Sequence, residues 1–280
     1  MGSFLKFGLM AADHPDNGAP DVLPIVRKYQ PNYLFYHNGQ LAEARWGGSE
    51  SGTVGYPCWS TFPYSATGTG ESAKKNIMAN DFKLLKEGDP NGKFWMPAMA
   101  DAPLRGYNGR HEWFWEPNDE DHIFPLENLM DMYYKSVGRN ATLIMGLTPD
   151  PNGLLPEPDV KRLKEWGDEI LSRFSNPLKT ISGVGNKLSI KFNKPTSINH
   201  IIIQEDISKG EKVRSYKIEA LINGKWQGVC EGQSIGHKRI EKIETITTNR
   251  LRFKVTNALG IPHIKNMSVY YVSDDKKLKR

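Results

Sequence analysis

Residues 126–147 have the sequence LENLMDMYYKSVGRNATLIMGL, and this stretch decides the fold class of the first half of the chain. Its first part spaces apolar side chains at intervals of three and four residues, which predicts an amphipathic helix over residues 126–137. Its second part, residues 141–147, is a short apolar run typical of a buried strand. A helix that leads directly into a buried strand is the repeating unit of an α/β fold.

The same alternation continues on both sides of this unit. Further strands are expected at residues 7–12, 33–36 and 94–96, and further helices at 20–30 and 159–174. Strands joined by helical crossovers predict a parallel sheet covered by helices. Residues 45–75 form a long loop rich in Gly, Ser, Thr and Pro, and a loop of this length is typical of a functional segment.

The second half of the chain has a different period. Apolar and polar residues alternate at 188–192, 216–220 and 251–255, and further strands are expected at 200–203 and 267–271. Short strands at this spacing predict an antiparallel sandwich. The charge changes in the same region: residues 1–175 carry a net charge of −6 and residues 176–280 carry +11. We therefore expect two domains, 1–175 and 176–280.

Composition excludes several classes of protein. The chain has 280 residues, of which 38% are hydrophobic and 25% charged, so it is not a disordered chain. No apolar run is long enough to predict a membrane span. The basic residues of the second half are dispersed among the strands, so we expect a solvated surface and no nucleic-acid partner. Cys58 and Cys230 have no metal-ligand spacing, and the N-terminus does not have the pattern of a secretory signal.

Carboxylates, tryptophans and arginines gather along the first half. Asp13, Glu50 and Asp101 lie at or just after predicted strand ends, among the tryptophans 46, 59, 95, 113 and 115. Paired carboxylates with aromatic platforms suit glycoside hydrolysis, in which one carboxylate attacks the anomeric carbon and another donates a proton. The alternative is structural, because an Asp at a strand end often caps a helix and a Trp often lies in the core.

Several motifs then identify a family resemblance. Residues 45–52, RWGGSESG, resemble the Arg-Trp-Val-Gly-Asn-Glu-x-Gly motif of the family 29 glycoside hydrolases, the α-L-fucosidases. Residues 95–101, WMPAMAD, resemble that family's Trp-x-Pro-x-Glu-x-Asp segment, and residues 133–140, YYKSVGRN, resemble a helix end of the family. Further matches, in the same order, are at 30–32, 59–61, 105, 113–114 and 149–154.

The resemblance implies a (β/α) barrel and an exo-acting, retaining hydrolase of terminal α-L-fucosyl or α-L-galactosyl residues. It implies that Glu50 is the general acid/base and that Asp13 is the candidate nucleophile. The implied substrate is an oligosaccharide or polysaccharide, and its expected contacts are His37, Arg45, Trp46, Trp59, Met99, Asp101, Arg105 and Trp113. No cofactor and no catalytic metal are expected, with a structural calcium ion in the sandwich as an option.

The chain departs from the family pattern at three points. Asp13 lacks the aromatic context and the following Gly of the family's nucleophile, so a turn or helix-capping role stays open for it. Met99 replaces a frequent Glu, which leaves an apolar wall where relatives have a carboxylate. The family's opening barrel strands have no match, which suggests that they are absent or replaced. The alternative function is therefore a non-catalytic carbohydrate-binding protein.

The second half resembles the discoidin-like, or galactose-binding-like, jelly roll (F5/8 type C) that often follows this barrel. The matching segments are 204–213, QEDISKGEKV, and 234–240, SIGHKRI, together with Trp226. Such a sandwich either packs on the barrel or binds sugar, and both roles stay open. The resemblance also implies a periplasmic or extracellular location.

Overall fold

A computed structural model describes residues 23–32, 44–65, 81–109 and 113–273. The strands expected at 7–12 and 33–36 lie outside these residues. The described chain divides into two compact units. The first contains the described residues up to Ala102 together with Ala141–Met145, and the second contains Pro103–Asn140 and the described residues from Gly146 onward.

The described residues of the first unit form two small sheets and two short helices. A three-stranded sheet has the order β1-β4-β5, and β1 runs parallel to β4. The strands β2 and β3 form an antiparallel pair. The elements are α2 (Leu23–Tyr29), β1 (Arg45–Trp46), β2 (Thr61–Phe62), α5 (Phe82–Glu87), β3 (Phe94–Trp95), β4 (Ala98–Pro103) and β5 (Thr142–Gly146).

The strand expected at residues 94–96 is not the strand that enters the parallel sheet. Residues 94–95 form β3, which pairs with β2, and the parallel strand is β4, which follows it. All six residues of β4, AMADAP, are buried. This strand could not be predicted from the sequence, because small residues and a terminal Pro have low β-propensity. Its conformation depends on the neighbouring strands of the sheet.

Two helices in the second unit follow the predicted pattern. The helix α6 (Leu126–Lys135) ends two residues before the expected limit, because Ser136 Oγ donates to Met132 O at 2.6 Å and Gly138 N donates to Tyr133 O. The helix α7 (Glu157–Phe174) begins after Pro156. No helix among the described residues is long and apolar enough to cross a membrane.

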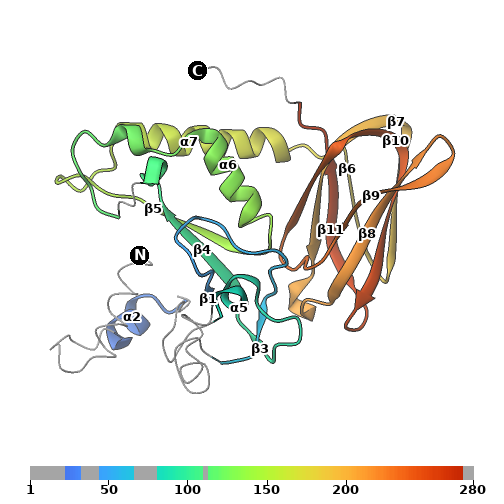
Figure 1. Cartoon of the computed structure of the whole chain (residues 1–280), viewed down its shortest axis with the longest axis horizontal. Coiled ribbons are helices and arrows are strands. Elements are labelled where there is room, and N and C mark those ends of the chain that lie inside the picture. The colour runs from blue at the N-terminus through green and yellow to red at the C-terminus, as the bar shows by residue number, and fades with distance from the viewer. Residues whose placement is uncertain (1–22, 33–43, 66–80, 110–112, 274–280) are drawn as a thin grey trace. The chain divides into compact units, whose positions relative to one another are not determined.

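The residues after α7 form a six-stranded antiparallel sheet with the order β6-β11-β7-β10-β8-β9. Its strands are β6 (Lys179–Val184), β7 (Lys187–Glu205), β8 (Val213–Ile222), β9 (Lys225–Gly232), β10 (Arg239–Ala258) and β11 (His263–Tyr270). The strands expected separately at 188–192 and 200–203 are one long strand, β7, which lies beside the similarly long β10 (Figure 1). The pairing of β7 with β10 shifts register between the pairs Thr248–Thr196 and Arg250–Lys191. Residues 192–195, at the end of the first expected strand and just beyond it, therefore form an irregularity within β7.

The strands of this sheet enclose one apolar core. It includes Ile201, Ile218, Ile235, Phe253 and Val269, which are fully buried. A second cluster joins the helices to the sheet: Phe174 of α7 contacts Tyr134 of α6, and both contact His200 of β7. The six-stranded sheet and the two helices therefore pack together within the second unit.

A buried polar clamp holds Asn140 in the same unit. Asn140 Oδ1 accepts a hydrogen bond from His237 N at 2.7 Å, and its Nδ2 donates to Glu211 Oε1 at 3.2 Å. A Cβ on Gly236 would lie 2.2 Å from Asn140 Oδ1, so only glycine fits there. Asn140 therefore connects three segments that the sequence analysis singled out: 133–140, 204–213 and 234–240.

Candidate functional site

The parallel pair β1–β4 positions the predicted acid/base motif. Arg45 pairs with Ala98, and Trp46, the last residue of β1, pairs with Met99, the second residue of β4. The chain leaves β1 at its carboxyl end, the end at which parallel α/β sheets carry their functional loops. Residues 47–52 form that loop.

Both ends of this loop are bound to β4. Gly47 N donates to Met99 O at 2.7 Å, and Gly52 N donates to Asp101 O at 2.8 Å. Gly48 and Gly52 have φ angles of +84° and +68°, which favour glycine. Hydroxyl groups of Ser49, Ser51 and Thr53 form a chain with successive distances of 2.8 Å. Glu50 is half-buried at the centre of this doubly attached loop.

A hydrogen bond joins the side chains of Trp46 and Asp101. Trp46 Nε1 donates to Asp101 Oδ1 at 2.8 Å, and only 5% of Asp101 is exposed. The Trp46 ring meets Phe82 of α5 edge to face, with ring centroids 6.3 Å apart. The carboxylate and the second ring fix the indole in position beside the loop that carries Glu50.

Arg45 is fully buried and faces the protein interior. Its Nε donates to Leu85 O at 2.8 Å and its Nη1 to Met96 O at 2.6 Å, while Nη2 lies 3.5 Å from Cys58 Sγ. The guanidinium therefore joins α5 and the segment before β4 to β1. This geometry suits a residue that positions Trp46, whereas the sequence suggested a direct substrate contact.

Two other predicted contacts are also buried. Only 4% of Trp59 is exposed, and its backbone N–H donates to Glu87 O at 2.7 Å. Only 3% of Met99 is exposed. Both side chains lie in the packed part of the first unit, and both can shape a pocket wall.

Arg105 and Trp113 lie in the second unit. Arg105 Nη2 donates to Asp159 Oδ1 at 2.8 Å, its Nε lies 3.2 Å from both Asp159 oxygens, and both side chains are buried. Among the described residues, Arg105 Nη1 has no hydrogen-bond partner. Trp113 packs against Gly146, the last residue of β5, where a Cβ would lie 2.4 Å from the ring.

The structure thus brings Arg45, Trp46, Glu50, Trp59, Met99 and Asp101 into one unit. Asp13 and His37 lie outside the described residues. Within the described ranges, no group of three or more His, Cys, Asp or Glu side chains could hold a metal ion. Both cysteines are free thiols.

Two residues that contact the predicted site residues, Phe82 and Asp159, were not predicted from the sequence as members of the site. Phe82 lies in a short helix, α5, whose six residues give little periodicity. Asp159 was expected only as the start of a helix, and its partner Arg105 is 54 residues away in the chain. A pairing at that separation leaves no local signal in a single sequence.

The comparisons with known proteins agree with the motifs. A solved structure from Bacteroides thetaiotaomicron VPI-5482, a candidate α-L-fucosidase, is 57% identical; the match covers 92% of this chain and 58% of that chain, with a TM-score of 0.83. A glycoside hydrolase 29 family member from an unknown rumen bacterium is 32% identical; the match covers 93% of this chain and 47% of that chain, with a TM-score of 0.76.

The chain also matches curated proteins. Alpha-L-fucosidase 1 of Arabidopsis thaliana is 26% identical over 283 residues, which cover 88% of this chain and 53% of the plant protein. The chain spans about half the length of the curated relatives it matches. No family model matches it. With 57% identity to one solved relative and the family's motifs in order, the chain belongs to the family 29 glycoside hydrolases, the α-L-fucosidase family.

Proposed function

We propose that the protein is an exo-acting α-L-fucosidase-type hydrolase that releases terminal α-L-fucosyl or α-L-galactosyl residues with retention. The observation that carries this proposal is the loop 47–52, which contains Glu50, follows directly on Trp46 and is attached at both ends to β4, the strand that carries Asp101. A proton donor needs such a fixed position, because general acid catalysis depends on the geometry between donor and leaving oxygen.

In this proposal Glu50 donates a proton to the leaving oxygen and then activates the attacking water. The indole of Trp46 provides an apolar face for the sugar ring. Asp13 is the proposed nucleophile, and retention requires its carboxyl group to lie about 5 Å from that of Glu50. Met99 is proposed to contribute an apolar surface that distinguishes a C6 methyl from a hydroxymethyl group.

The domain organisation follows the same proposal. Residues 1–175 contribute a (β/α) barrel, and residues 176–280, with their six antiparallel strands, form a jelly-roll sandwich. The family resemblance is also the basis on which we propose a periplasmic or extracellular location.

The direct test is hydrolysis of 4-nitrophenyl α-L-fucoside and 4-nitrophenyl α-L-galactoside by the full-length protein. We expect release of nitrophenol from at least one of them and no release from the β-L-fucoside, because the proposed site acts on one anomeric configuration. If neither α-L-glycoside is turned over, the hydrolase proposal is wrong. Saturable binding of fucose without turnover would instead favour the non-catalytic carbohydrate-binding function.

The role of Asp101 has a separate test. Asp101→Asn keeps an oxygen that accepts from Trp46 Nε1, whereas Asp101→Ala leaves the indole N–H without this acceptor. If Asp101 positions Trp46, the Asn variant should stay within a few-fold of the unmodified kcat/KM. The Ala variant should lose roughly 10-fold or more, from the 1–3 kcal/mol of an unsatisfied buried donor. Equal losses in both variants would show that the carboxylate itself takes part in the chemistry.

A further inference from the structure

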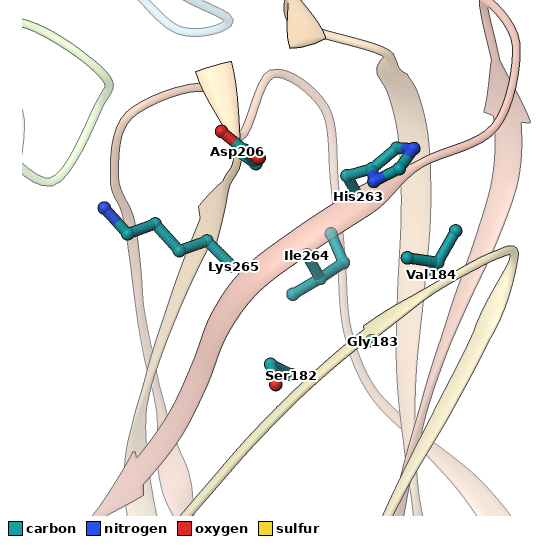
Figure 2. A pocket seen from close by; sticks show the side chains of 7 residues that line it. All are labelled: Ser182, Gly183, Val184, Asp206, His263, Ile264 and Lys265. Carbon is teal, nitrogen blue, oxygen red and sulfur yellow. The ribbon is translucent and has the colours of Figure 1, made fainter. Parts of the chain in front are cut away.

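The cavity between β6 and β11 offers little open apolar surface. Its volume is about 360 Å³, and the side chains that line it include Asp206, Lys265 and Ile264 (Figure 2). Only 2% of Ile264 is exposed, and this side chain belongs to the apolar core of the six-stranded sheet. We assign no binding role to this cavity.

The helix α5 of the first unit packs against the loop 47–52. The position that a Cβ on Gly48 would occupy is 3.4 Å from Cδ1 and Cε1 of Phe82 and 3.3 Å from Cγ of Lys86. Phe82 and Lys86 are four residues apart on α5, so they project from the same face of the helix. Gly48 comes two residues before Glu50 in the chain. The Phe82 ring therefore borders the loop that carries the proposed acid/base.

Several hydrogen bonds hold α5, and with it Phe82, in place. Asp81 Oδ1 caps the helix by accepting from a backbone N–H of its first turn at 2.9 Å. The side chain of Leu85 is fully buried, and its carbonyl oxygen accepts from Arg45 Nε at 2.8 Å. The Phe82 ring also meets the Trp46 indole edge to face. A side chain on such an anchored helix has a defined position before any ligand binds.

Phe82 stays accessible in spite of these contacts. Its exposed fraction is 43%, although one part of the ring lies against Gly48 and another against Trp46. The exposed part of the ring is apolar, so covering it with the apolar face of a ligand is favourable. The structure thus presents an open aromatic surface directly beside the Glu50 loop.

We propose that Phe82 is a platform for the leaving group, the saccharide to which the terminal α-L-sugar is attached. This inference rests on the proposed hydrolase function, in which Glu50 donates a proton to the leaving oxygen. A general acid must lie within hydrogen-bond reach of that oxygen, so the leaving group lies beside the loop that carries the acid. The C–H face of its first sugar ring then covers the exposed part of the Phe82 ring. Phe82 therefore favours a saccharide over a small leaving group.

The test compares two substrates of the full-length protein that have the same terminal α-L-sugar: a disaccharide and a glycosyl fluoride. Fluoride is a single atom and cannot cover an aromatic ring, whereas a sugar can. Phe82→Ala should lower the ratio of kcat/KM for the disaccharide to kcat/KM for the fluoride by roughly 10-fold, which corresponds to about 50 Å² of apolar surface no longer buried. A looser Trp46 indole would affect both substrates and cancel in this ratio. Phe82→Tyr keeps the ring and should keep the ratio within a few-fold.

The matched control is Phe94→Ala. Phe94 is 42% exposed but lies in β3, which pairs with β2, so its removal should leave the ratio unchanged. An unchanged ratio in Phe82→Ala would overturn the inference and leave the hydrolase proposal intact, and so would hydrolysis of the fluoride but of no disaccharide by the unmodified protein. Phe82→Leu, which keeps an apolar side chain against Trp46, gives the same comparison if Phe82→Ala does not fold. Hydrolysis of neither substrate by the unmodified protein would overturn both proposals.

Discussion

Replacing Glu50 with glutamine should slow the hydrolysis of an unactivated fucosyl disaccharide by roughly 10²–10⁴-fold, the usual contribution of a positioned general acid. A sugar leaving group needs protonation as it departs, and a glutamine side chain has no proton to transfer. The loop 47–52 should keep its conformation in the variant, because its hydrogen bonds to β4 come from the backbone of Gly47 and Gly52. Steady-state rates of the full-length protein on the disaccharide measure the loss.

The substrate and added azide identify the acid/base role. A nitrophenyl glycoside needs little protonation, so its glycosylation step should be far less impaired by Glu50→Gln than that of the disaccharide. Azide should partly restore turnover where deglycosylation limits the rate, because an anionic nucleophile needs no general base. Glu244→Gln is the matched control, since Glu244 is an exposed residue of β10. Equal losses on both substrates with no azide rescue would exclude Glu50 as the acid/base.

Replacing Arg105 with methionine should lower the free energy of unfolding of the second unit by about 3–5 kcal/mol. The substitution leaves the Asp159 carboxylate, which is fully buried, without the guanidinium that donates to both of its oxygens. A buried carboxylate without a partner is much more costly than an exposed one. Chemical denaturation and amide exchange of α7, which carries Asp159, measure the change.

A double variant separates the ion pair from simple packing. Arg105→Met combined with Asp159→Leu removes both charges and fills much of the same volume, so it should recover most of the lost stability. The exposed pair Lys164–Asp168 on the same helix is the control. Loss of that pair should cost less than about 1 kcal/mol. If the double variant is no more stable than the single one, the cost of Arg105→Met comes from packing and the uncompensated charge is not its cause.

Elements with strong periodicity or a clear chain break could be predicted from the sequence. The stretch 126–147 predicted both α6 and β5. Its apolar residues first recur every three or four positions, as on one face of a helix, and then form a short continuous run, as in a buried strand. The alternation after residue 179 gave antiparallel strands. The strand β4 could not be predicted, because AMADAP has no periodicity and forms a strand only between the neighbours that cover it.

The candidate site divides in the same way. The sequence alone was sufficient for the family and for the order of the motifs that contain Trp46, Glu50 and Asp101, since these depend on residue types at fixed spacing in the chain. Only the tertiary structure decided that Asp101 accepts from the Trp46 indole across 55 residues and that Arg45 is fully buried among backbone carbonyls. A residue's type states which hydrogen bonds it can make. Which partner it meets depends on strand register and burial, and these are properties of the folded chain.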